Sequence, residues 1–196
     1  KEEGHSLILE KGLKDKSYQV IGVCLQAIAD KDTDKAMRYA KDLEKENSNS
    51  VKQIIGSLYG LYGTIGNHDF FANSISSMSG VSQYTMMNDY SKFLAKLPED
   101  KLSISYPVFQ NVIEENSTWW VKLSGYQGLI NSRNRISNRL AELETELSVS
   151  EEPTKRSKIE RKISNMKLSL NEVDSFYNNL KSKEQDVKVL NYLNNM

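Results

Sequence analysis

Few residues of this sequence are of a type that could do chemistry. His5 and His68 are its two histidines, and Cys24 is its single cysteine. The sequence lacks the His-Glu-x-x-His pattern of zinc peptidases and the paired cysteines of thiolate zinc sites. His68-Asp69 follows a Gly-Asn turn, which is more typical of a helix start than of a metal-binding pair. The histidines and the cysteine therefore predict no metal site.

Motifs for nucleophiles, phosphates and calcium are also missing. There is no Gly-x-Ser-x-Gly turn, no Gly-x-Gly-x-x-Gly loop and no phosphate loop ending in Gly-Lys-Ser or Gly-Lys-Thr. Cys24 lies in the apolar run from Val20 to Ile28, which favours a core position. Asp30, Asp32 and Asp34 alternate as in a calcium loop, but the glycine and distal glutamate are not at the required offsets. We predict no catalytic, cofactor-binding or metal-binding residue in this chain.

The composition is that of a helix-rich protein without a net charge. The 196 residues include 26 Lys plus Arg and 26 Asp plus Glu, so no overall charge attracts nucleic acid or an anionic membrane. Only 3 prolines and 10 glycines are present to interrupt helices. No apolar stretch approaches the roughly 18 to 20 residues that span a membrane. We therefore expect neither a nucleic-acid partner nor a membrane span.

The beginning of the sequence suggests an excised piece. The chain starts at Lys1 without a methionine, inside a predicted helix from Glu2 to Leu13. We expect a trimmed chain or a part of a longer polypeptide, whose targeting signal could lie upstream. A single cysteine forms no disulfide within the chain and so does not indicate the compartment. Cytoplasmic and periplasmic or secreted locations both stay open.

Hydrophobic residues recur with a helical period and predict an all-α fold. After the helix over 2–13, we expect helices that begin after Ser17, at Asp32 or Asp34, and at Ser48 or Ser50. A turn at 63–67, a helix over 69–78 and a break at Ser79-Gly80 follow. Further helices are predicted over 84–97, over 102–115 with a bend near Pro107, and over 118–131. The expected buried faces are Val20, Val23, Cys24 and Ala27; Ala36, Met37, Ala40 and Leu43; and Val51, Ile54, Ile55, Leu58 and Tyr62.

Three helix starts share one plan, in which an acidic residue precedes a serine and a valine then opens the buried face. They are Asp15 to Val20, Glu46 to Val51 and Glu115 to Val121, and a degenerate copy would lie near Val81 to Met86. The three valines, at positions 20, 51 and 121, are 31 and 70 residues apart, which fits a period of 31 to 35. Such a period predicts a HEAT/ARM-like α-solenoid of paired antiparallel helices. The alternative is that Ser-x-x-Val is simply how capped helices begin.

Small residues and tryptophans indicate how the helices pack. Two strips of small residues occur at helical spacing, Gly56, Gly60 and Gly63 in the first and Ser124, Gly125 and Gly128 in the second. Such strips let helix backbones approach closely. The adjacent residues Trp119 and Trp120 must point to different faces of a helix. We expect one of them in the core between repeats and the other toward a groove or a neighbour.

The pattern changes after Asn131. Apolar residues at 4-3-4 spacing over 136–147 and 159–173 predict an antiparallel hairpin with a polar turn at 148–154. Five of the six arginines fall on this hairpin, at Arg133, Arg135, Arg139, Arg156 and Arg161. Interleaved glutamates favour a solvated face over a basic patch for an acidic partner. The chain ends in apolar residues between Phe176 and Leu193, which we expect to dock on the repeats and cap them.

Several of these segments resemble the C-terminal helical-repeat domain of bacterial zinc aminopeptidases, the aminopeptidase-N-like enzymes of the gluzincin group. The resemblance is carried by Leu13 to Val20, Asp34 to Ala40, Glu46-Asn47-Ser48, Asn116-Ser117 with Trp119-Trp120-Val121, and Leu180 to Asp186. It covers about residues 5–130 and 177–193. The family's zinc-binding His-Glu-x-x-His, its distal glutamate ligand and its Gly-x-Met-Glu-Asn motif are absent, and they would belong to an upstream catalytic domain. The hairpin at 132–175 is longer than the family pattern.

The resemblance implies a non-catalytic domain that walls the substrate cavity and supports a catalytic domain that removes N-terminal residues from peptides. Its partners would be that upstream domain of the same polypeptide and the peptides of the full enzyme, with zinc held outside this chain. Residues 1–131 would be the helical repeats, and 132–196 the hairpin and a terminal capping helix, within one structural domain. The alternatives are a free-standing HEAT- or TPR-like scaffold, and a coiled-coil adaptor that dimerises through 132–175.

Overall fold

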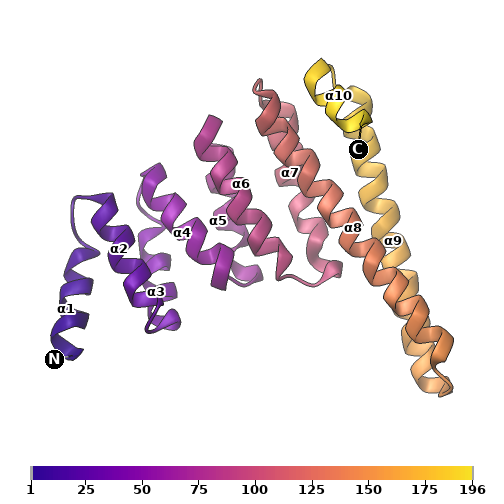
Figure 1. Ribbon diagram of the computed structural model, residues 1–196, viewed down its shortest axis with the longest axis horizontal. Helices are drawn as coiled ribbons and strands as arrows, with labels where there is room; N and C mark the ends of the chain where they lie inside the picture. Colours follow the sequence, from indigo (N-terminus) through magenta and orange to yellow (C-terminus); the bar gives the residue numbers. More distant parts are fainter. Residues whose placement is uncertain (1, 196) are drawn as a thin grey trace. The chain divides into compact units, whose positions relative to one another are not determined.

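The prediction of an all-α fold is confirmed. The computed structural model describes the backbone of residues 2–195 and the side chains of residues 7–195. These residues form ten α-helices and two short 3-10 helices, η1 and η2, and no strand (Figure 1). The chain divides into two compact units, one ending at Lys96 and the other beginning at Leu97.

The first unit is a two-layer arrangement of helices. Its helices are α1 (Glu2–Gly12), α2 (Tyr18–Ala29), α3 (Thr33–Leu43), α4 (Asn49–Tyr62), η1 (Ile65–Asn67), α5 (His68–Ser77) and α6 (Gly80–Ala95). Helix α4 packs between α2 and α6, so these three helices form one layer (Figure 1). In the view of Figure 1, α3 and α5 lie behind that layer, α3 against α2 and α4, and α5 against α6.

Most helices of this unit start close to their predicted positions, but α6 begins at Gly80 and not at the predicted position 84. Asp32 caps α3, because its side chain accepts a hydrogen bond from the backbone N–H of Lys35 at 2.9 Å. Ser17 and Ser48 precede α2 and α4 as predicted, but neither side chain makes a capping hydrogen bond. Gly80 has a φ of 57°, a left-handed conformation that glycine adopts without strain, and it separates α5 from α6.

Two members of the predicted glycine strip, Gly56 and Gly60, lie at a close contact between α4 and α6, whereas Gly63 lies just beyond the end of α4. A Cβ at Gly60 would lie 3.0 Å from the backbone oxygen of Asp89 on α6. A Cβ at Gly56 would lie 2.6 Å from the sulfur of Met86. The absence of side chains at both glycines therefore lets α4 and α6 pack with almost no space between their backbones. Around this contact the fully buried rings of Phe71, Tyr90 and Phe93 fill the core, and they contact one another.

Several apolar positions of the first unit are not buried where the sequence predicted. Val20 and Val23 are exposed, Val23 by 69%, and the buried face of α2 is formed by Ile21, Cys24, Leu25, Ile28 and Ala29. The same helical period fits both faces, and the face with isoleucine and leucine removes more apolar area from water. Tyr62, at the end of α4, is exposed as well. Val81, the valine of the degenerate copy, is 72% exposed, whereas Val51 is fully buried as predicted.

The second unit is dominated by two long helices. Its elements are η2 (Glu99–Ser105), α7 (Tyr106–Glu115), α8 (Trp119–Val149), α9 (Pro153–Lys183) and α10 (Val187–Asn194). The prediction of one helix over 102–115 with a bend at Pro107 is wrong. The chain forms a 3-10 helix first, and Pro107 lies in the first turn of α7, where its missing N–H leaves no hydrogen bond unmade. Helix α8 runs through residue 131 without interruption.

The predicted antiparallel hairpin is present. Helices α8 and α9 have 31 residues each, pack against each other, and are joined by residues 150–152. The buried seam residues are Ile136, Leu143, Ile159, Ile163, Met166 and Val173. The second small-residue strip is also confirmed, because a Cβ at Gly125 would lie 3.0 Å from the backbone oxygen of Phe109 on α7. Helix α10 packs on α8 through the buried residues Val189 and Leu193.

Candidate functional site

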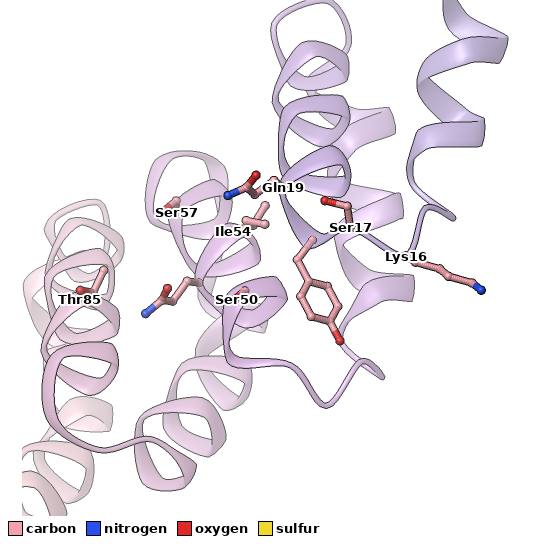
Figure 2. Close-up of a pocket in the computed structure, with 9 residues that line it drawn as sticks. Lys16, Ser17, Gln19, Ser50, Ile54, Ser57 and Thr85 are labelled. Atoms are coloured by element: carbon pink, nitrogen blue, oxygen red, sulfur yellow. The ribbon is translucent and has the colours of Figure 1, made fainter.

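The first unit carries an open groove of about 680 Å³. It crosses one face of the layer formed by α2, α4 and α6 (Figure 2). Its lining residues are Lys16, Ser17, Tyr18, Gln19, Ser50, Gln53, Ile54, Ser57 and Thr85. We refer to it as the α2–α4–α6 groove.

The first turns of α2 and α4 contribute part of this groove. Ser17, Tyr18 and Gln19 come from the start of α2, and Ser50 comes from the start of α4. Because α2 and α4 pack side by side, their first turns lie next to each other. The next helix of the layer, α6, adds Thr85. The packing of these three helices thus brings uncharged polar side chains to one face.

Most of the polar side chains in the groove are available to a ligand. No hydrogen bond or ion pair involves the side chain of Gln19, Gln53 or Thr85 within the part of the chain that the structure describes. Ser57 differs, because its Oγ donates to Asp89 Oδ2 at 2.9 Å. Asp89 is buried and also accepts from Lys92 Nζ at 2.7 Å. Lys92 therefore balances the negative charge of the carboxylate beneath the groove.

Two apolar side chains give the groove a partly hydrophobic surface. Tyr18 is exposed and Ile54 is half-buried. Ile54 lies against the backbone of α2, since a Cβ at Gly22 would be only 2.9 Å from Ile54 Cδ1. A larger residue than glycine at position 22 would therefore displace the isoleucine from the groove. Figure 2 shows Gln19, Ile54 and Ser57 on neighbouring surfaces, with Lys16 projecting away from them.

The second unit has a smaller cavity of about 250 Å³, and its polar groups already bond to one another. Glu184 Oε1 accepts from Lys122 Nζ at 3.0 Å, and Tyr126 O–H donates to the backbone oxygen of Leu180 at 3.1 Å and to Glu184 Oε2 at 3.3 Å. Burial and the nearby Glu184 carboxylate raise the pKa of Tyr126 above its ordinary range. Because these groups satisfy one another, we assign the cluster a structural role.

The histidine and aspartates singled out in the sequence serve the fold. His68 begins α5, as predicted, and its Nδ1 lies 3.0 Å from the hydroxyl of Tyr90. Asp30 accepts from Gln26 Nε2 at 2.8 Å, and Asp32 caps α3. Cys24 is buried in the core. Within the described residues, no three His, Cys, Asp or Glu side chains come together as metal ligands, and the side chain of His5 lies outside those residues.

Neither tryptophan of α8 is fully buried. Trp119 is 38% exposed, with Lys188 Nζ 5.6 Å from its ring centroid, and Trp120 is half-buried. The expectation that one tryptophan fills the core is therefore wrong. The buried stripe of this part of α8 is formed by Val121, Gly125, Tyr126, Gly128 and Leu129, and it includes neither tryptophan.

Most arginines of the hairpin bind groups of the chain itself. Arg133 pairs with Asp174 and Arg139 with Glu142, at 2.5 and 2.7 Å. Arg135 bonds to Glu99 at 2.9 Å and to the backbone oxygen of Leu97 at 2.7 Å. Arg156 donates to the backbone oxygens of Leu147 and Ser150 and so closes the turn between α8 and α9. These contacts favour the solvated face over a basic patch for an acidic partner.

Sequence reasoning identified the helix starts but missed the groove that they form. Its amides and hydroxyls, at Gln19, Gln53 and Thr85, carry no motif of their own. One signal could have indicated a neighbouring part of the groove, at Ser50: the uncharged polar run Asn47 to Ser50 stands out in a sequence with 27% charged residues. Such a run at a helix start is available for contacts with a ligand because it forms no ion pairs.

Comparisons with known proteins return no relative. No family model, no curated protein and no solved structure matches this chain. Among the described residues, no helix is both long and apolar enough to cross a membrane.

Proposed function

We propose that this chain is a non-catalytic α-helical domain of a zinc aminopeptidase. It would wall the substrate cavity and support an upstream catalytic domain that removes N-terminal residues from peptides. The zinc ion and the catalytic residues would belong to that upstream domain, and we assign none of them to this chain.

One observation carries the proposal. Two segments with the family resemblance, Leu13 to Val20 and Glu46 to Ser48, lie at or beside the α2–α4–α6 groove. A wall that guides peptides needs side chains that bond to peptide groups but perform no reaction. The amides of Gln19 and Gln53 and the hydroxyl of Thr85 meet this need, since none of them makes a hydrogen bond or an ion pair among the described residues.

The proposal includes a HEAT/ARM-like α-solenoid architecture for the first unit. In a solenoid, each helix pair packs on the next and equivalent positions line one continuous face. The stacking of α2, α4 and α6 in one layer, with α3 and α5 in the other, is consistent with such pairs. In such an architecture the first turns of α2 and α4 would be equivalent positions of successive repeats, and they would therefore line the same face.

An activity assay and the upstream reading frame test this function. The purified chain should release no amino acid from aminoacyl-anilide substrates, with or without added zinc, because its sequence does not contain the His-Glu-x-x-His motif of such enzymes. The reading frame upstream of Lys1 should encode a His-Glu-x-x-His motif. Robust activity of this chain that a chelator abolishes would overturn the proposal. So would a start codon directly before Lys1.

The second candidate is a free-standing HEAT- or TPR-like scaffold that binds a protein. It is favoured by the exposed valines of α2, Val20 and Val23, because exposed apolar side chains often mark contact surfaces. The two candidates differ in gene structure and in activity. A scaffold would have its own start codon and would remain without peptidase activity in every context, whereas the full enzyme would be active.

A further inference from the structure

We propose that the α2–α4–α6 groove binds an extended, uncharged peptide segment of about five residues, held mainly through its main chain. The inference deepens the proposed function and rests on it for the presence of a peptide at this face. It adds what the proposed function leaves open, namely which peptide segments this wall accepts and how it holds them.

The chemistry of the lining points to main-chain recognition. Each side-chain amide of Gln19 and Gln53 can both donate and accept a hydrogen bond, as a peptide group does. Neither is used within the described residues, and the hydroxyl of Thr85 is also unused. An extended segment leaves its peptide N–H and C=O groups open to such partners, and this mode of binding depends little on the ligand's side chains.

The charge of the lining selects the ligand. Lys16 is the single ionic side chain among the nine lining residues, and it projects away from Ile54 and Ser57 (Figure 2). The nearby carboxylate of Asp89 is buried and paired with Lys92. A charged ligand side chain between α2 and α6 would lose water without meeting an opposite charge, which is unfavourable. Uncharged side chains can instead pack on Tyr18 and Ile54.

The length of the segment follows from helix geometry. Packed helices lie about 8 to 10 Å apart, so the distance from α2 across α4 to α6 is roughly 18 Å. An extended chain advances about 3.3 Å per residue, so roughly five residues cross the layer. Such a segment would place its ends near Gln19 and Thr85 and its middle over Gln53 and Ile54.

Fluorescence anisotropy with short labelled peptides tests this inference. The first probe is a five-residue peptide of Ala, Ser and Val, acetylated and amidated so that it carries no charge. The second and third probes replace the central residue by Lys or by Asp. We expect the neutral probe to bind at least tenfold more tightly than either charged probe. Equal affinities, or no binding of the neutral probe at millimolar concentration, would overturn the inference.

Substitutions in the groove locate the binding site. Gln53→Ala and Gln19→Ala should each weaken binding of the neutral probe about three- to tenfold, as expected for the loss of a hydrogen bond. Gln26→Ala is the matched control, because Gln26 lies on α2 outside the groove and bonds to Asp30. Groove variants that bind like this control would contradict the inference, provided that circular dichroism shows them folded.

A charge placed in the groove gives a gain of binding, which unfolding cannot mimic. Thr85→Glu should lower the affinity for the neutral probe and raise the affinity for the lysine probe at least tenfold. No preference of this variant for lysine over aspartate would overturn the inference. All these measurements test peptide binding alone. The proposed function is tested separately by the activity assay and the upstream reading frame, so either one can fail without the other.

Discussion

Lys122 Nζ lies 3.0 Å from Glu184 Oε1, and this ion pair joins α8 to the residue that ends α9. The side chains are 17% and 2% exposed. Glu184 Oε1 also accepts from the backbone N–H groups of Gln185 and Asp186 at 3.0 and 2.9 Å. The carboxylate therefore fixes the turn from which α10 begins and through which α10 returns to α8.

Replacing Glu184 by glutamine should lower the free energy of unfolding by about 3 kcal/mol, because Lys122 would be left as a largely buried cation without a counter-ion. Urea unfolding followed by circular dichroism measures the change. Asp100→Asn is the control: Asp100 pairs with Lys101, both side chains are more than half exposed, and the expected change is below about 1 kcal/mol. Equal losses in the two variants would contradict the role of the buried pair.

The same carboxylate should make the free energy of unfolding fall as the pH falls. Burial by itself would raise the pKa of Glu184, but the N–H groups of Asp186 and Gln185 and the Lys122 ammonium outweigh burial and lower it. A carboxyl with a lowered folded-state pKa adds stability that is complete above its unfolded pKa of about 4.3 and is lost as the pH falls through the folded pKa. Urea midpoints between about pH 6 and pH 3 should fall more in the wild type than in Glu184→Gln. Parallel curves would refute this prediction.

His68 should make stability fall at mildly acidic pH. Burial lowers the pKa of His68, against an opposing effect of Asp69. Because the folded-state pKa is below the unfolded value of about 6.5, the unfolded state takes up the proton first, and stability is lost as the pH falls below about 6.5. Thermal melts should show that Tm falls less in His68→Gln than in the wild type between about pH 7.5 and pH 5. His5 is present in both proteins and so serves as the internal control.

Gly60→Ala should destabilise the first unit by about 1 to 3 kcal/mol. The new Cβ would lie 3.0 Å from the backbone oxygen of Asp89, and a backbone atom cannot move aside as a flexible side chain can. At Gly66 the nearest atom to a new Cβ would be Thr64 Oγ1 at 3.8 Å, so Gly66→Ala should leave stability unchanged within about 0.5 kcal/mol. Chemical denaturation of both variants checks the difference, and a harmless Gly60→Ala would show that the contact is looser than described.

The seam between α8 and α9 should be far more sensitive to substitution than the outer face of the hairpin. Ile136 is fully buried, so Ile136→Ala should cost about 2 to 4 kcal/mol, whereas Leu168 is 66% exposed and Leu168→Ala should cost little. Because each helix buries its seam on the other, we also expect a monomer in light scattering. A dimer that Leu168→Ala dissociates would favour the coiled-coil adaptor instead.

The sequence by itself determined the helical character of this chain, the approximate start of most helices and the hairpin. Asp32 and Gly80 act within a few residues of their own positions, so their effects on the backbone can be predicted without the rest of the fold. The glycine strips at Gly60 and Gly125 were also predictable, because a close helix contact requires small side chains at helical spacing.

Tertiary structure alone decided which faces are buried and where the groove lies. On α2, Val20 and Ile21 belong to overlapping apolar stripes, and only the positions of α1, α3 and α4 select the stripe with Ile21. The groove depends on the same packing, since Gln19 and Thr85 lie 66 positions apart in the sequence and line the same groove only because α4 packs between α2 and α6. Periodicity specifies that a helix has an apolar face, but the packing of neighbouring helices determines which side chains remain for a ligand.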